Sequence, residues 1–208
     1  MAKSKVRNLI LLVFVLVLVM TYVARVAVVN GNAVHVPTYI YEKGEVVDFG
    51  YDYIDTIDEC IPGYAMQVLG YELIDTKDLY ERYNLGTIDE NGVANTPFYC
   101  LVKVRFYNKD CYLGETGGIA LQRYALEGDD YMVLVSENVF CSMYPDMPDT
   151  SFSLKKGTSM EFDLPYPISA AVGKKKADLQ RKPPMLEITE FPNRRLLKVQ
   201  EEIDNGKD

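Results

Sequence analysis

The sequence predicts a mainly β protein, an immunoglobulin-like antiparallel β-sandwich with one short helix, preceded by one N-terminal transmembrane helix. The first observation is an uncharged run of 16 residues from Leu9 to Ala24. The second is a series of six or seven short segments in which apolar and polar residues alternate, separated by Gly, Pro, Asn and Asp. The third is that helical patterns do not alternate with these strands, which argues against a parallel α/β sheet.

The N-terminal segment is long and apolar enough to cross a membrane. The apolar run resumes after Arg25, so residues 9–29 provide 21 positions, and a spanning helix needs about 20. Basic residues are more numerous before the run than after it: Lys3, Lys5 and Arg7 against Arg25. The positive-inside rule therefore places the N-terminus in the cytoplasm and the rest of the chain outside. A cleaved signal, which would release a secreted domain, is the alternative, since Gly31-Asn32-Ala33 offers small residues for cleavage.

Four segments follow along the chain. We expect a cytoplasmic tail and transmembrane signal-anchor at residues 1–29, an extracytoplasmic stalk at 30–59, the β-sandwich domain at 60–200 and a disordered tail at 201–208. The stalk is assigned because Asp48, Asp52, Asp55 and Asp58 interrupt its alternating pattern. It contains at most one edge strand, around Tyr39 and Tyr41.

The domain begins with a strand, a helix and a turn. Alternation over Gly63–Asp75 predicts the strand. A short helix follows, because Asp75 or Thr76 can cap it, KDLYERY contains helix-forming residues and Gly86 can end it. The sequence DENG at Asp89–Gly92 predicts a turn.

The clearest strand is FYCLVKVRFYN, residues 98–108. Its apolar side chains share one face: Phe98, Cys100, Val102, Val104 and Phe106. The next segment, GIALQRYALEGDDYMVLVSENVF, predicts two strands that reverse at Glu127–Asp130, where Gly128 can take a positive φ.

The last third predicts the remaining strands. In SFSLKKGTSMEFDLPYPI, Phe152 and Leu154 precede a Lys-Lys-Gly turn and an alternating strand follows it, which Pro165 and Pro167 are expected to end because proline lacks a backbone donor. PPMLEITEF and RRLLKV give the last two, joined at Pro192-Asn193. A helix is the alternative for the last, because Leu196, Val199 and Ile203 are helically spaced.

Disulfides are permitted but not specified. Four cysteines, Cys60, Cys100, Cys111 and Cys141, form an even set in a chain predicted to be exported. Three connectivities exist, and the pairing is not predicted. A Cys100–Cys111 bond is disfavoured, because a hairpin turning at 108–110 separates the two residues along the strands. Cys100 also fits a free thiol buried in the apolar face of its strand.

The distribution of charge excludes nucleic acid as a partner. Residues 30–168 contain 23 Asp and Glu against 9 Lys and Arg, a net charge of −14, which repels phosphate. Residues 169–200 contain 8 basic and 3 acidic residues, a net charge of +5. The basic segment GKKKADLQRKPP, Gly173–Pro184, predicts either a patch for an anionic lipid or polymer, or a solvated hairpin loop whose lysines balance the acidic body.

The sequence predicts no catalytic, cofactor-binding or metal site. The single histidine, His35, lies in the expected stalk, which cannot hold a base within about 3 Å of a nucleophile. The chain lacks the G-x-x-x-x-G-K-[ST], G-x-G-x-x-G and G-x-S-x-G patterns. Its cysteines and histidine also lack the close spacing of a zinc site.

Acidic loops and tyrosines are the remaining candidates for function. Two groups of carboxylates suit calcium, although neither matches the D-x-[DN]-x-[DN]-G loop: Asp52, Asp55, Asp58 and Glu59, and Asp129, Asp130, Asp146 and Asp149. A glycoside hydrolase needs two carboxylates within about 5–9.5 Å, and the sequence singles out no such pair. The clustered tyrosines suit either a recognition surface or the filling of a sheet: Tyr39, Tyr41, Tyr51, Tyr53, Tyr64 and Tyr71.

The order of these segments resembles a known type of domain. A single N-terminal anchor, GYAMQVLGYELIDTKDLYERY, FYCLVKVRFYN and FSLKKGTSMEFDLPYPI follow one another, as in the small membrane-anchored telokin- or immunoglobulin-like domains of unknown function of Gram-positive bacterial envelopes. Val104–Asn108, Gly157 and Leu164-Pro165 would take the places of that family's strand-and-turn motifs. The resemblance covers roughly residues 63–168. It implies the sandwich and a location at the cell surface, and it implies no activity and no site.

Together these observations predict a non-catalytic protein that binds another envelope protein or a wall polymer. The membrane is a partner through residues 9–29. A ligand- or calcium-sensing ectodomain is the alternative, and an extracellular carboxylate-dependent hydrolase is the third hypothesis.

Overall fold

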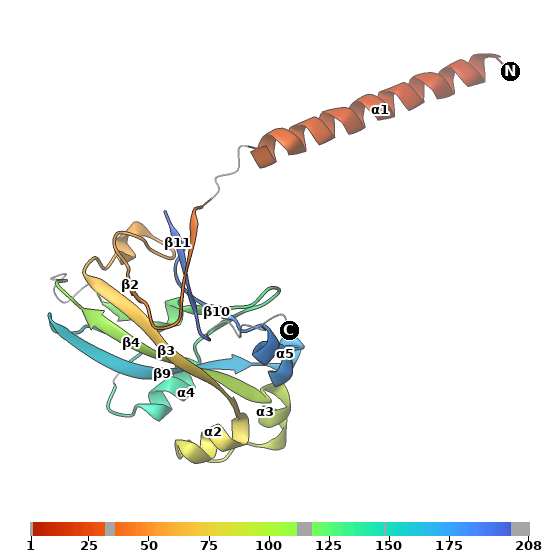
Figure 1. The fold of residues 1–208 in the computed structure, drawn as a ribbon. Helices are drawn as coiled ribbons and strands as arrows, with labels where there is room; N and C mark the ends of the chain where they lie inside the picture. The colour runs from red at the N-terminus through yellow and green to blue at the C-terminus, as the bar shows by residue number, and fades with distance from the viewer. Residues whose placement is uncertain (1, 32–35, 112–117, 148, 201–208) are drawn as a thin grey trace, which may run out of the picture. The chain divides into compact units, whose positions relative to one another are not determined.

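The computed structural model describes residues 2–31, 36–111, 118–147 and 149–200, and the chain divides into two compact units, 1–35 and 36–208. The first unit contains one helix, α1 (Ala2–Gly31) (Figure 1). Its apolar part, Ile10–Gly31, has 22 residues and is long and apolar enough to cross a membrane. At a rise of about 1.5 Å per residue it extends about 33 Å, slightly more than the hydrocarbon core of a bilayer.

The second unit is mainly β and contains two larger sheets. The five-stranded sheet has the order β1 (Thr38–Tyr41), β11 (Arg194–Lys198), β10 (Met185–Thr189), β6 (Ala125–Glu127) and β7 (Met132–Leu134). The four-stranded sheet has the order β2 (Val46–Asp48), β3 (Tyr64–Asp75), β4 (Phe98–Asn108) and β9 (Thr158–Ile168). A small third sheet pairs β5 (Ile119–Ala120) with β8 (Ser151–Phe152). The prediction of a mainly β protein with an apolar N-terminal helix is confirmed.

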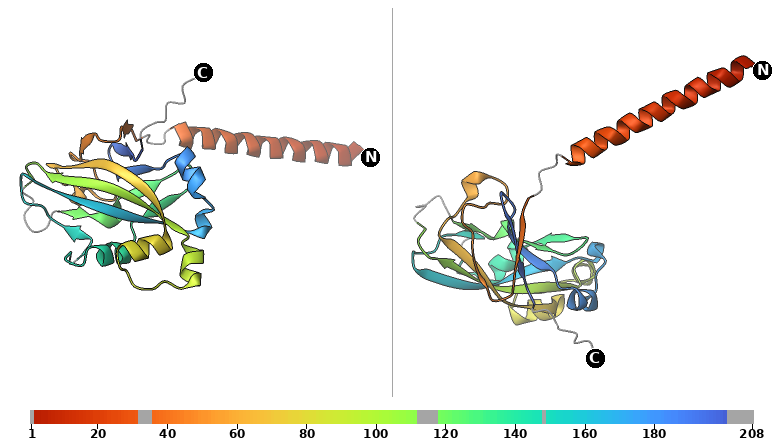
Figure 2. Two further views of the ribbon diagram at one scale, coloured as in Figure 1. Left: turned by 60° about the horizontal axis from the view of Figure 1, so that its bottom comes forward. Right: turned by 45° about the horizontal axis from the view of Figure 1, so that its top comes forward.

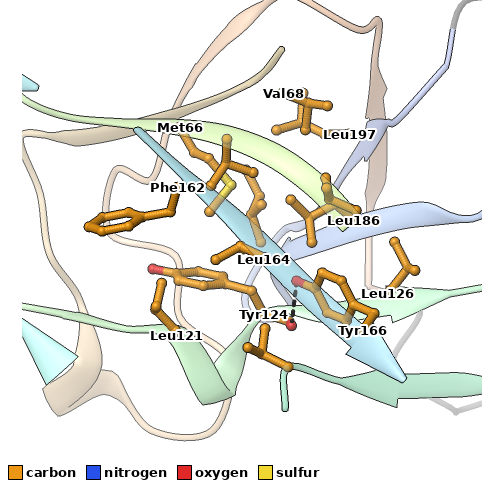
Figure 3. Packing of buried hydrophobic residues seen from close by; sticks show 14 of the residues in the cluster. Met66, Val68, Leu121, Tyr124, Leu126, Phe162, Leu164, Tyr166, Leu186 and Leu197 are labelled. Carbon is orange, nitrogen blue, oxygen red and sulfur yellow. Dashed lines mark hydrogen bonds between the residues drawn. The ribbon is translucent and has the colours of Figure 1, made fainter. Parts of the chain in front are cut away.

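One hydrophobic core joins the two larger sheets. Met66 of β3 and Leu164 of β9 belong to the same buried cluster as Leu186 of β10 and Leu197 of β11 (Figure 3). Polar atoms inside this cluster are paired, since the Tyr166 hydroxyl donates a hydrogen bond of 3.1 Å to the carbonyl oxygen of Tyr124. The apolar residues that alternate along the strands therefore face one shared core.

The outer face of the four-stranded sheet is covered by helices. A second buried cluster consists of Ile74, Leu79, Tyr99, Leu101, Val139 and Met143, from β3, β4, α2 (Thr76–Arg82) and α4 (Glu137–Met143). Figure 2 shows both helices against this sheet from two further directions. Because α2 and α4 cover that face, β4 is buried on both sides from Phe98 to Val102, beyond the one-sided burial that its alternation predicts.

The expectation that prolines end the last strand of the four-stranded sheet is wrong. β9 continues through Pro165 and Pro167, which lie opposite Leu101 and Tyr99 of β4. Because β9 is an edge strand, these prolines can direct their nitrogen atoms away from β4. The carbonyl oxygen of Pro165 supports this direction, since it accepts a hydrogen bond of 2.8 Å from the Ser136 N–H outside the sheet.

The segment expected to be a stalk belongs in large part to the folded domain. β1 pairs in parallel with β11, and β2 pairs antiparallel with β3, so residues 38–41 and 46–48 are strands of the two sheets. Asp52 holds the following loop in place, because its buried carboxylate accepts a hydrogen bond of 3.0 Å from Asn193 and contacts Arg195 at 2.7 Å. The parallel pairing also departs from the all-antiparallel arrangement that we expected.

The domain contains more helix than the single short helix predicted. α2 forms where expected, but α3 (Glu90–Asn95) replaces the predicted turn, because the Asp89 side chain accepts a hydrogen bond of 2.7 Å from the Gly92 N–H and caps it. The basic segment forms α5 (Lys176–Arg181) instead of a hairpin loop. Three short 3-10 helices complete the described part of the domain: Ile57–Glu59, Leu121–Arg123 and Ala170–Val172.

The segment 118–140, predicted as two strands, contains β6 and β7 but also a 3-10 helix at Leu121–Arg123. α4 replaces the end of its second strand, because Val139, Phe140 and Met143 are buried on one helical face.

The hairpin and the last pair of strands are confirmed. β6 and β7 form the antiparallel pair that reverses around Gly128, and β10 and β11 form the last pair. The final segment is thus a strand and not a helix, and the Phe191–Pro192 peptide bond before its turn is cis. The predicted tail at 201–208 lies outside the described residues.

Candidate functional site

A pocket of about 500 Å³ lies between α5, the β6–β7 hairpin and the strands β10 and β11. Its lining is formed by three separate stretches of the chain: 127–131, 173–185 and 194–196. Figure 1 shows the green hairpin ending beside the blue helix α5. The volume falls within the range of about 300–1,000 Å³ that is typical of small-molecule sites.

Two carboxylates and one guanidinium form the most buried polar group at this pocket. Arg194 of β11 donates from Nε to Glu187 of β10 at 2.7 Å, and its Nη2 contacts the same carboxylate at 2.5 Å. The same Nη2 also contacts Glu127 of β6. Because both carboxylates contact one nitrogen atom at hydrogen-bond distances, they lie within about 6 Å of each other.

Glu187 is the most buried of these three side chains. Its side chain is 5% exposed, whereas those of Arg194 and Glu127 are 26% exposed. Burial raises the pKa of Glu187 above its ordinary value, while the hydrogen bond from Arg194 acts in the opposite direction. Glu187 therefore lies behind Arg194, and Arg194 and Glu127 face the pocket.

Ion pairs at the edge of the pocket connect the hairpin to the basic segment. Lys174 donates to Asp130 at 2.8 Å, and Lys182 contacts Asp129. The hydrogen bond from Lys174 lowers the pKa of Asp130, so this carboxylate is ionised at neutral pH. The expectation that these lysines balance the acidic body agrees with this pairing.

α5 is positioned by one buried side chain and by its own hydrogen bonds. Leu179 is 2% exposed and belongs to the main core, so it fixes the helix to the domain. The Lys175 N–H donates to the Asp178 carboxylate at 3.0 Å at the start of the helix. Asp178, Arg181 and Lys182 then share one helical face and line the pocket.

Tyr131 forms an aromatic wall of the pocket. The Lys174 ammonium lies 5.9 Å from the centre of its ring. The ring lies so close to Gly128 that a β-carbon at that position would approach it to 2.1 Å, so only glycine fits. The hydroxyl is buried and has no hydrogen-bond partner among the described residues. Burial, followed by the nearby Cys100, raises the pKa of Tyr131 to about 12, so the hydroxyl is neutral.

The two carboxylates beside Arg194 bear on the hypothesis of a carboxylate-dependent hydrolase. A pair of carboxylates that hydrolyses a glycoside needs one protonated member as the acid. In this structure burial raises the pKa of Glu187, and Arg194 contacts both Glu127 and Glu187. The charged side chains that line the pocket are paired with one another and held in place.

The cysteines are not gathered at one site. Each of the four, all within the described residues, is a free thiol in the structure. Cys100 is fully buried in β4, where desolvation raises its pKa far above the ordinary value. Cys60 is partly exposed and donates to the carbonyl oxygen of Tyr51 at 3.0 Å. The interpretation of Cys100 as a buried thiol agrees with this structure, and the formation of disulfides stays a prediction.

Half of the eight acidic residues considered for calcium are paired with basic side chains. Asp52 contacts Arg195, and Glu59 contacts Arg123 at 3.1 Å. Asp129 and Asp130 contact the lysines of the basic segment. Across residues 2–31, 36–111, 118–147 and 149–200, no three His, Cys, Asp or Glu side chains are placed to hold a metal ion. His35 lies outside the described residues.

The tyrosines of the first part of the domain divide into buried and exposed members. Tyr64 is buried in the core, and Tyr41 and Tyr71 pack against it. Tyr53 packs on Phe191 with ring centres 6.1 Å apart. Tyr39 and Tyr51 are exposed, at 49% and 77%. The filling of sheets therefore accounts for about half of the cluster, and the pocket uses a different tyrosine.

Sequence reasoning missed the pocket because three distant segments form it. It also missed Glu187 and Arg194, although a signal was present. Both are charged residues within strands that were predicted to pair across one turn, where opposite charges attract.

Comparison with known proteins identifies a family. A family model described as a domain of unknown function, DUF5028, matches residues 38–195. No curated protein and no solved structure matched the chain. The matched stretch begins at the first residue of β1 and ends within β11, so it covers nearly all of the two sheets and all of the pocket lining except Leu196. Because it covers more than half of the sequence, the chain belongs to the family of the domain of unknown function DUF5028.

Proposed function

We propose that this chain is a non-catalytic, membrane-anchored protein whose β domain lies outside the membrane of a Gram-positive type of cell envelope and binds another envelope protein or a polymer. The pocket beside α5 carries the binding part of the proposal, because it combines a suitable volume with polar groups held in place by ion pairs. The apolar helix supports the anchoring part. The basic residues before the run, Lys3, Lys5 and Arg7, support an N-terminus in the cytoplasm.

The proposed fold type is a β-sandwich of the loose immunoglobulin-like kind. Two sheets with one shared core support it. Such domains present loops and sheet faces to partners while the core maintains their positions. The pocket lies at loops and at a helix joined to such a frame, which suits recognition.

The location is tested with the full-length chain carrying a C-terminal tag, produced in a Gram-positive host. Protease added to intact protoplasts is expected to remove the tag and to leave the N-terminal helix protected. A tag that resists protease until the cells are lysed would contradict the proposed orientation. The intact mass of the recovered chain distinguishes a retained anchor from a cleaved signal.

Binding is tested in the same cells with matched charge reversals. Arg181→Glu with Lys182→Glu changes two exposed residues of the pocket, and Lys155→Glu with Lys156→Glu makes the same change in an exposed turn that does not line it. Partners are measured as cross-linked envelope proteins and as co-sedimentation with purified wall polymer. We expect the first variant to lose the partner and the second to retain it. Equal retention by both variants would contradict a role for the pocket.

A further inference from the structure

We infer that the pocket beside α5 binds a neutral, polyhydroxylated ligand, such as a segment of an uncharged glycan. This inference deepens the proposed function and rests on it. The argument depends on the balance of charges in the lining, on the pairing of each charge, and on the apolar surface between them.

The lining carries equal numbers of opposite charges. Its acidic residues are Glu127, Asp129, Asp130 and Asp178, and its basic residues are Lys174, Arg181, Lys182 and Arg194. Glu187 behind Arg194 adds one buried negative charge. Such a lining presents little net potential to a charged ligand, whereas a phosphate site would present an excess of positive charge.

Each basic side chain of the lining is already paired with a carboxylate. Arg181 contacts Asp178 at 3.3 Å, Lys174 contacts Asp130 at 2.8 Å, Lys182 contacts Asp129, and Arg194 contacts two glutamates. An anion would have to displace these partners. A hydroxyl group does not, because it can donate to the carboxylate and accept from the cation of the same pair. Neighbouring hydroxyls on one ring therefore match a row of such pairs.

Apolar groups lie between the ion pairs. The ring of Tyr131 and the side chains of Met185, Pro183 and Leu196 also line the pocket. A sugar ring has C–H groups on its faces and hydroxyls at its rim, so it can pack against an aromatic ring while its rim bonds to polar groups. A small polar ligand without an apolar face would leave these apolar side chains in contact with water.

The decisive experiment measures how binding responds to the sign of a removed charge. Lys182→Met and Asp129→Asn each remove one member of the same exposed pair, and Lys155→Met is the control. For a neutral ligand, both changes remove a hydrogen-bonding group, so both are expected to weaken binding about three- to tenfold. For a charged ligand the two changes would act in opposite directions. The control is expected to leave affinity unchanged.

The probes are the neutral linear tetrasaccharides of N-acetylglucosamine and of glucose, together with a glycerol phosphate oligomer and spermidine as charged probes. Binding to the full chain in neutral detergent is measured by calorimetry at low and high salt. We expect one of the tetrasaccharides to bind with an affinity that changes less than about twofold with salt, since a neutral ligand has no charge to screen. Binding of only a charged probe with salt-dependent affinity would overturn the inference, and so would the failure of both tetrasaccharides at millimolar concentration.

Different results would contradict the proposed function and the inferred ligand class. If the cross-linked partner in cells depends on Arg181 and Lys182 while no tetrasaccharide binds, the proposed function holds and the ligand class is wrong. If a tetrasaccharide binds but the chain has its domain in the cytoplasm, the ligand class holds and the proposed location is wrong.

Discussion

At the scale of single residues, Arg194 contributes both to the stability of the sheet and to the lining of the pocket. It connects three neighbouring strands, because it contacts Glu187 on β10 and Glu127 on β6 from its own position on β11. A carboxylate as buried as Glu187 is costly to leave without a partner. Arg194 therefore contributes to the sheet and to the pocket at the same time.

Replacing Arg194 is expected to destabilise the domain, because Glu187 then has no ion-pair partner. Arg194→Met leaves Glu187 buried and unpaired, so we expect the free energy of unfolding to fall by about 3 kcal/mol. Adding Glu187→Leu to the same chain removes the orphaned charge and is expected to restore most of the loss. Denaturant unfolding of the full chain in detergent, followed by circular dichroism, measures both variants.

The control for this cycle is Lys198→Met on the same strand. Lys198 pairs with Glu42, whose side chain is 58% exposed, so the pair is expected to contribute less than about 1 kcal/mol. If Arg194→Met were no more destabilising than this control, the ion triad would have no special structural role.

At the scale of elements, the covered edge of β9 explains why its prolines are tolerated. The Asp163 N–H donates to the Tyr144 hydroxyl at 2.8 Å, and the Pro165 carbonyl accepts from the Ser136 N–H. Both groups point away from β4, and their partners flank α4. This segment therefore caps an edge that would otherwise be open to pairing with another chain.

Tyr144→Phe tests this cap. The variant keeps the ring, which packs 4.9 Å from Phe140 and 5.3 Å from Phe162 between ring centres, and it removes only the acceptor of the Asp163 N–H. We expect a loss of about 1–2 kcal/mol in unfolding free energy, because a partly buried donor is left unpaired. Hydrogen exchange at the Asp163 amide is expected to accelerate as well. The exposed Tyr51→Phe is the control, and equal behaviour of the two variants would show that the cap does not stabilise the edge.

Elements whose evidence is local were predictable, and elements that depend on distant partners were not. Neighbouring residues determine the alternation in β3 and β4 and the chain reversal at Gly128. These strands and this reversal form as expected. The burial of α5 depends chiefly on Leu179 meeting a core assembled from other strands, so its short basic sequence resembled a loop. The prolines of β9 are acceptable only because of the position of that strand in the sheet, which the sequence around them does not state.

At the scale of the whole molecule, the domain is expected to be sensitive to alkali. Burial raises the pKa of Tyr83, Tyr99 and Tyr131 from 10.0 to about 12. The folded state therefore holds these protons more tightly than the unfolded chain, so the stabilisation is complete below pH 10 and is lost as the pH rises from 10 towards 12. Unfolding free energies measured across this window should fall steadily, with tyrosinate absorbance rising at unfolding. Tyrosinate that formed near pH 10 in an intact fold would contradict this expectation.

The mainly β class and the apolar N-terminal helix could be predicted from the whole sequence, because both follow from simple patterns of apolar residues. The candidate site could not, because its lining combines residues 127–131 with 173–196. No local pattern indicates that the β6–β7 hairpin meets α5. Only the charges of the hairpin and of the basic segment gave a hint, since they are opposite and pair in the structure.

The parallel pair of β1 and β11 has a consequence for the order in which the sheets form. Thr38 lies opposite Arg194, 156 positions later in the chain, so the first strand of the domain can pair only after the last has been synthesised. In the export that we propose, β1 would leave the membrane long before β11. The hairpin of β6 and β7 and the pairing of β3 with β4 can form earlier, because they join nearer segments. The five-stranded sheet therefore closes only when β11 has been synthesised, and a truncation before β11 would leave β1 without its partner strand.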